Sequence, residues 1–184
     1  MKSEYVYTSV LRSPECLHIL YSAYKPFLDR FGELLGGAPS LYHASFTPHP
    51  PRAALSDTTS PATEIVTMYF PTSYSKADQD EVVKKAKAAI EIVEREAKEY
   101  RASAGGWVEE EIDIPETDEK AKAYVLLIGW TSVEAHIEFR SHPAFQEVIP
   151  NLRGNKDLKK LTAVHAHLTE TTGGPSGVGD VSDL

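Results

Sequence analysis

Short runs of β-branched and aromatic residues alternate along this chain with longer stretches in which apolar residues recur every three or four positions. The longer stretches predict helices that begin at Ser13, Ser75 and Thr131, because that spacing gathers apolar side chains on one helix face. The short runs predict β-strands at residues 5–11, 41–46, 64–70, 107–114, 124–130 and 161–169. The hydrophobic pattern therefore predicts successive strand–helix–strand units.

Polar residues at the helix starts and glycines at the helix ends support these boundaries. Ser75 is followed by Asp78, and Thr131 is followed by Glu134, which is the spacing of a capping box. The glycine pair at residues 105–106 predicts the end of the second helix, because glycine accepts the left-handed conformation that follows a helix. We therefore expect a long second helix and a shorter third one.

Composition divides the chain into four parts. Residues 48–63 hold a cluster of Pro, Ser and Thr, which predicts a linker. The linker separates an N-terminal β-α-β half module, residues 1–47, from residues 64–169, where the predicted order is β-α-β-β-α-β. Residues 170–184 are rich in glycine and predict a flexible tail.

The order β-α-β-β-α-β is that of a ferredoxin-like module, in which two helices cover one face of a four-stranded antiparallel sheet. The predicted fold class is therefore α+β, with one complete ferredoxin-like module after the half module. Residues 5–47 also match residues 124–169 at several positions, including His43-Ala44 against His165-Ala166. These matches predict an internal repeat, although two β-α-β units of similar composition would look alike without one.

Composition and charge limit the classes of partner. The chain of 184 residues has a formal net charge of −8 and no cluster of basic residues, so a nucleic-acid partner is not expected. It has one cysteine, Cys16, and no apolar run long enough to span a membrane. These features predict a cytoplasmic protein without a membrane segment.

Residues 130–145 carry a motif that can be compared with known families. It reads Trp130-Thr-Ser-x-Glu-Ala-His, with Phe139 and His142-Pro-x-Phe145 after it, and Val-His-Ala-His closes the unit at residues 164–167. The motif resembles the antibiotic-biosynthesis-monooxygenase-like family of dimeric α+β barrels. The resemblance covers the complete module well and the half module in part.

Family members include cofactor-free oxygenases of aromatic polyketides, haem-degrading enzymes, haem-binding dehydratases and decarboxylases. The resemblance therefore implies a small aromatic ligand and a homodimer without fixing the activity. The half module has too few strands to mirror a four-stranded sheet. We therefore expect residues 5–47 to pack on the sheet of residues 64–169 and two chains to associate.

The candidate chemistry begins with histidines. His165 and His167 alternate on the last predicted strand and so share a face, where they could transfer protons, bind substrate or form only a polar surface. A metal site is not predicted, because no further ligand accompanies them at a suitable spacing. His136 and Arg140 lie one turn apart on the third predicted helix, where they could hold an anionic or phenolic group or face solvent.

Aromatic residues on the predicted strands complete the set. Trp130 could stack on an aromatic substrate, although core packing is the simpler explanation. The same two interpretations apply to Tyr69, Trp107 and Tyr124, whose polar groups need partners when buried. We therefore predict His136 and His167 as catalytic residues, and Trp130, Arg140, Tyr124, Tyr69, Trp107 and His165 as substrate-binding residues.

Two classes of function stay open at this point. By resemblance, the chain would be a cofactor-free monooxygenase, or a related isomerase or lyase, acting on a phenolic or polyketide-like aromatic. Such an enzyme needs an apolar cavity, a base such as histidine, and donors that hold the enolate. The alternative is a non-catalytic ligand-binding or interaction module of the same fold, or a haem-binding member, which an absorption spectrum after haem addition would identify.

Overall fold

The computed structural model describes residues 42–55 and 60–167. Its strands are β1 (Ala44–Thr47), β2 (Ala62–Phe70), β3 (Tyr100–Val108), β4 (Ile112–Asp113), β5 (Lys120–Trp130) and β6 (Lys160–His167), and its helices are α2 (Lys76–Glu96), α3 (Val133–Arg140) and α4 (Phe145–Arg153). None of these helices is long and apolar enough to cross a bilayer. The predicted strand at residues 5–11, the helix beginning at Ser13 and the tail lie outside the described residues.

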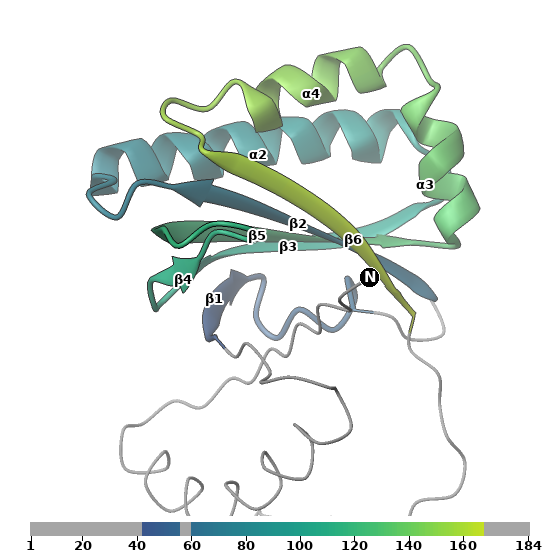
Figure 1. The fold of residues 1–184 in the computed structure, drawn as a ribbon. Helices are drawn as coiled ribbons and strands as arrows, with labels where there is room; N and C mark the ends of the chain where they lie inside the picture. The colour runs from purple at the N-terminus through teal and green to yellow at the C-terminus, as the bar shows by residue number, and fades with distance from the viewer. Residues whose placement is uncertain (1–41, 56–59, 168–184) are drawn as a thin grey trace, which may run out of the picture.

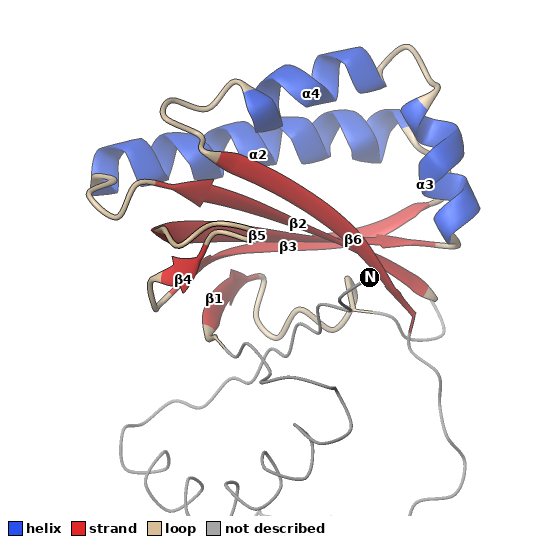
Figure 2. Cartoon of the chain, in the orientation of Figure 1, coloured by secondary structure: helices blue, strands red, loops and turns tan. Residues whose placement is uncertain are grey.

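The described strands form one antiparallel sheet in the order β1-β3-β5-β2-β6, with β4 paired to β5 off this path. β2 lies between β5 and β6, so that Glu64 is opposite Ile128 on one side and His165 on the other. All three helices cover the same face of the sheet (Figure 1, Figure 2). The predicted α+β ferredoxin-like arrangement is confirmed, and β1 adds a strand beside β3.

The two central strands are buried on both faces, because successive side chains of a strand point to opposite sides. On the helix side, Val66 and Leu126 pack with apolar residues of α2 such as Val93. On the helix-free side, Ile65 and Leu127 belong to a second apolar core. Two cores therefore lie back to back across the sheet.

Residues 42–55 contribute to the core on the helix-free face. Tyr42, Ala44, Phe46 and Ala54 are buried there. Figure 1 shows β1, at the edge of the sheet beside β3, and the loop after it on the side away from the helices. The expected packing of the N-terminal unit on this sheet therefore holds for residues 42–47, and the division of the chain into domains stays a prediction.

Part of the predicted linker also belongs to the packed structure. Ser60 is fully buried, and its hydroxyl donates to the Ala53 carbonyl at 2.8 Å. A Cβ placed on Gly129 of β5 would lie 2.5 Å from the Ser60 Oγ. The absence of a side chain at Gly129 is what lets this segment approach the sheet.

The predicted start of the second helix is confirmed, and its predicted end is wrong. Ser75 is the N-cap of α2, and its Oγ accepts the Asp78 backbone N–H at 3.1 Å. The helix ends at Glu96, and β3 occupies residues 100–108. The strand predicted at residues 107–114 has the wrong bounds, since residues 107–108 are the end of β3 and residues 112–113 form the separate short strand β4.

The glycines of β3 permit close contacts and do not end a helix. A Cβ on Gly106 would lie 2.4 Å from the backbone oxygen of Ser45, so Gly106 allows β1 to pair with β3. A Cβ on Gly105 would lie 2.1 Å from the Tyr124 hydroxyl, so Gly105 makes room for that ring. Both glycines therefore serve the sheet.

The third helix is capped by a different residue from the one predicted. Ser132 is the N-cap of α3, and its Oγ accepts the Ala135 N–H at 3.1 Å. The Thr131 hydroxyl instead donates to Glu99 at 2.7 Å, which ties the end of β5 to the turn before β3. The helix ends at Arg140 and is much shorter than α2, as expected of the third helix.

Candidate functional site

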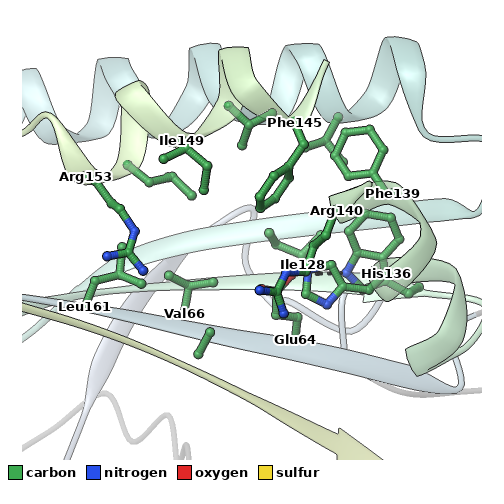
Figure 3. A pocket seen from close by; sticks show the side chains of 15 residues that line it. Glu64, Val66, Ile128, His136, Phe139, Arg140, Phe145, Ile149, Arg153 and Leu161 are labelled. Atoms are coloured by element: carbon green, nitrogen blue, oxygen red, sulfur yellow. Dashed lines mark hydrogen bonds and ion pairs between the residues drawn. The ribbon is translucent and has the colours of Figure 1, made fainter. Parts of the chain in front are cut away.

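A cavity of about 370 Å³ lies between the helices and the sheet. Figure 3 shows Phe145 and Ile149 on its helical side and Val66 and Leu161 on its sheet side. Its volume lies within the range of small-molecule sites. The apolar lining consists of Val66, Val93, Ile128, Phe139, Phe145, Val148, Ile149, Leu152, Leu161 and Ala163, and the polar lining of Glu64, Trp130, His136, Arg140 and Arg153.

Glu64 places a carboxyl group in this apolar wall. It lies on the helix-facing side of β2 and is only 7% exposed. The Trp130 indole N–H donates to its Oε2 at 3.3 Å, and the His136 Nε2 lies 3.4 Å from the same oxygen. Strand β2 therefore fixes the position of the carboxyl, and β5 and α3 supply its two polar neighbours.

His136 connects Glu64 to the surface. Its ring packs against Trp130 with a centroid distance of 5.2 Å. The other ring nitrogen, Nδ1, lies 2.7 Å from Nε2 of His165 on β6. His136 is buried, whereas His165 is exposed, so the three side chains form a continuous line of polar groups from the cavity wall to solvent.

Burial shifts the pKa of both inner groups toward their uncharged forms. It raises the pKa of the Glu64 carboxyl from 4.5 to about 7, although the Trp130 N–H and the charge of Arg140 oppose the shift. Burial also lowers the pKa of His136, and with the smaller effects of the neighbouring His165 and Arg140 it falls from 6.5 to about 4. At neutral pH, His136 is therefore uncharged and Glu64 exchanges readily between its two forms.

The line of groups has two hydrogen-bonded arrangements. When Glu64 is protonated, its O–H can donate to His136 Nε2, and His136 Nδ1–H can donate to His165. When Glu64 is ionised, His136 Nε2–H donates to the carboxylate and Nδ1 accepts a proton held by His165. Passing from the first arrangement to the second moves one proton from Glu64 to His165 and leaves His136 neutral.

Two arginines provide positive charge at the cavity. Arg140 of α3 and Arg153 of α4 both line it and both are exposed, and Figure 3 shows their guanidinium groups directed toward the sheet side. Among the described residues, neither guanidinium has a hydrogen-bond or ion-pair partner. The cavity can therefore accept an anionic group of a ligand. Within the same residues, no three His, Cys, Asp or Glu side chains are arranged to hold a metal ion.

The structure brings some predicted site residues together and separates others. Trp130, His136 and Arg140 line the cavity, and His165 reaches it through His136. Tyr69 is buried on the helix-free face, Trp107 and Tyr124 line a different cavity, and His167 is the last residue of β6, with its Cα opposite that of Ala62. The catalytic and binding roles of all these residues stay predictions.

Sequence reasoning missed Glu64 and Arg153. A signal for Glu64 is present, because it is the only charged residue in the run Ala62–Phe70. A carboxylate in a strand whose pattern indicates burial on both faces is a candidate for a shifted pKa. No comparable signal marks Arg153, which follows an ordinary amphipathic stretch.

The chain has distant structural neighbours. No protein-family model matches the sequence, and no curated protein matches it. A monooxygenase of Streptomyces coelicolor in complex with nanaomycin D is 20% identical with a TM-score of 0.46, over 62% of this chain and 93% of that one. A protein of Arabidopsis thaliana is 20% identical with a TM-score of 0.42, over 61% and 99% of the two chains. Likeness at this level says nothing about activity, and membership of the antibiotic-biosynthesis-monooxygenase-like family stays a prediction.

Proposed function

We propose that this chain is a cofactor-independent enzyme that removes a proton from a weakly acidic C–H or O–H group of a small, largely apolar molecule. The observation that carries the proposal is Glu64, a buried carboxyl in the cavity wall with a pKa of about 7. A general base is most effective when its pKa lies near the working pH. His136 and His165 then carry the proton toward solvent.

The lining of the cavity supports a phenolic or polyketide-like aromatic substrate. Trp130, Phe139 and Phe145 offer aromatic surface against which a planar ring packs favourably. Arg140 and Arg153 would hold a carboxylate, or the oxygen that becomes an enolate or phenolate when the proton leaves. Removing the proton next to such an oxygen creates negative charge where the arginines stabilise it.

The deprotonated substrate determines the reaction that follows. An electron-rich carbanion reduces molecular oxygen, so that a CH₂ group and O₂ become a C=O group and water. The substrate supplies all the electrons, one oxygen atom enters the ketone, and the other leaves as water with the two hydrogens of the CH₂ group. A substrate that does not reduce oxygen would instead undergo isomerisation or elimination.

Anthrone is a suitable probe, because its acidic CH₂ group lies in a planar aromatic frame. With the purified full chain, oxygen uptake and the appearance of anthraquinone should proceed faster than the spontaneous reaction in buffer, with one O₂ consumed per anthrone. Deuterium uptake by 2-tetralone in D₂O tests the proton transfer without oxygen. Binding of both probes with neither reaction accelerated would overturn the enzyme and support the non-catalytic ligand-binding module.

We also propose that two chains form a homodimer. Among the described residues, β6 is an edge of the sheet, and an edge strand offers backbone N–H and C=O groups to a second copy. Light scattering at micromolar concentration should therefore give a mass near twice that of the 20.3 kDa chain. A single species with the mass of one chain would contradict the dimer and leave the proposed chemistry untouched.

A further inference from the structure

A second cavity, of about 550 Å³, lies between α2 and the strands β3 and β5. It shares no lining residue with the first cavity. Ser103 and Gly105 occupy the helix-facing positions of β3 here, opposite Val83 and Ile90 of α2. Because neither strand residue fills the space beneath the helix, a hollow remains.

Tyr124 supplies a hydroxyl group to this cavity. It lies over Gly105, close enough that a Cβ there would be 2.1 Å away. Tyr124 is only 5% exposed, and its hydroxyl makes no hydrogen bond within residues 42–55 and 60–167. Burial raises its pKa to about 12, so it stays a donor. In this position the O–H is free to donate to an acceptor on a ligand.

Trp107 adds a second donor beside the first. Its Nε1 is buried without a hydrogen-bond partner among the described residues. Trp107 and Tyr124 are opposite each other on β3 and β5, and their rings meet edge to face with centroids 5.3 Å apart. Unsatisfied buried donors are uncommon in folded proteins, so Trp107 Nε1, with the Tyr124 hydroxyl beside it, marks a wall that a ligand with an acceptor would complete.

The charges at the rim of this cavity differ from those of the first. Glu91 and Glu94 of α2 line it and are exposed, together with Lys87. Among the described residues none of the three has an ion-pair partner. The two carboxylates disfavour an anion, whereas the arginines of the first cavity favour one.

We propose that this second cavity binds a neutral, planar aromatic ketone. The carbonyl oxygen accepts the Tyr124 hydroxyl, and the ring lies beside Trp107 against the apolar side chains of α2. Each property of this ligand fits one feature of the cavity. Its planar ring fits the aromatic surface, its carbonyl oxygen accepts the hydroxyl donor, and its neutrality suits the acidic rim. The site is separate from the acid–base site and does not depend on the proposed function.

Chromone, a neutral planar ketone, is the probe. The full chain has two tryptophans, so its ¹H–¹⁵N spectrum holds two indole N–H signals, which the Trp130→Phe variant assigns. Titration with chromone should move the Trp107 signal in a saturable way and leave the Trp130 signal in place. Movement of the Trp130 signal alone, or of neither signal, would overturn the proposal.

Two variants and one control variant locate the binding within the cavity. Tyr124→Phe keeps the ring and removes the donor, so chromone should bind about three- to tenfold more weakly. Tyr42→Phe, the same change on the helix-free face, should leave the affinity unchanged. Ser103→Leu fills the hollow and should abolish the Trp107 shift. Equal affinities in the wild type, Tyr124→Phe and Ser103→Leu would show that chromone binds elsewhere and end the proposal.

Discussion

Replacing Glu64 by glutamine should slow turnover by about a hundredfold to ten-thousandfold, which is the contribution of a positioned general acid or base. Glutamine has nearly the same shape and can still accept the Trp130 N–H, so the cavity wall should persist. Glutamine cannot take up a proton from the substrate, so no proton passes to His136. Anthrone oxidation at saturating anthrone measures the effect, and circular dichroism checks the fold.

The pH dependence of the same rate gives an independent readout. The wild-type rate should rise with pH through about 7, since only the ionised Glu64 accepts a proton. The Glu64→Gln variant should lose this rise. Glu110→Gln is the matched control, because Glu110 is an exposed carboxylate that accepts the His43 backbone N–H at 2.8 Å, away from the cavity. A Glu64→Gln protein with the wild-type rate and pH profile would exclude Glu64 as the base.

Substituting Glu64 and substituting His136 should make the stability of the fold change with pH in opposite directions. Because the pKa of Glu64 is raised from 4.5 to about 7, the folded state holds a proton that the unfolded state releases. Its contribution to stability is therefore fully present below pH 4.5 and is lost as pH rises to 7. For His136, whose pKa falls from 6.5 to about 4, the unfolded state holds the extra proton, so stability rises between pH 4 and 6.5.

In the wild type these two contributions nearly cancel between pH 4.5 and 6.5. In this range the unfolded state holds its proton on His136 and the folded state holds one on Glu64, so folding neither takes up nor releases a proton. In Glu64→Gln the free energy of unfolding should rise with pH, because only the effect of His136 remains. In His136→Gln it should fall with pH, because only the effect of Glu64 remains. Each change should reach about 3 kcal/mol. Arg140 from α3, His165 from β6 and Trp130 from β5 face the pair in every variant, so their effects are shared.

Urea unfolding at a series of pH values measures these slopes. The double variant, Glu64→Gln with His136→Gln, is the control and should regain the flat profile of the wild type. Slopes of the same sign in the two single variants would contradict the assigned charge states. The measurement needs no substrate, so it tests the electrostatics of the site separately from the enzymatic proposal.

The central strands and the start of α2 were predictable because their signals are local. The runs that became β2 and β5 are apolar and β-branched, and Ser75 caps α2 as expected. β3 was not predictable, because Tyr100–Val108 reads Y-R-A-S-A-G-G-W-V. Alanine, serine and glycine have little strand propensity. Their small size is required by contacts with β1 and Tyr124, which only the folded chain reveals.

The candidate site likewise contains residues that the sequence could group and one, Glu64, that it could not. Trp130, His136 and Arg140 could be grouped from the sequence, because one strand end and one short helix hold all three. Glu64 lies 66 positions before Trp130, and its place depends on the registers of β2 with β5 and β6. A shift of one residue would turn its side chain to the other face, and no local pattern fixes that choice.

Strand β2 has an antiparallel neighbour on each side, which determines where this protein could be redesigned. Backbone pairing with β5 and β6 holds Glu64 in place, whereas Phe139, Phe145 and Ile149 come from helices that meet the sheet through side chains alone. Reactivity and selectivity therefore belong to separate parts of the architecture. A library confined to those three helical positions should change which molecules are accepted while preserving the titration of the carboxyl beneath them.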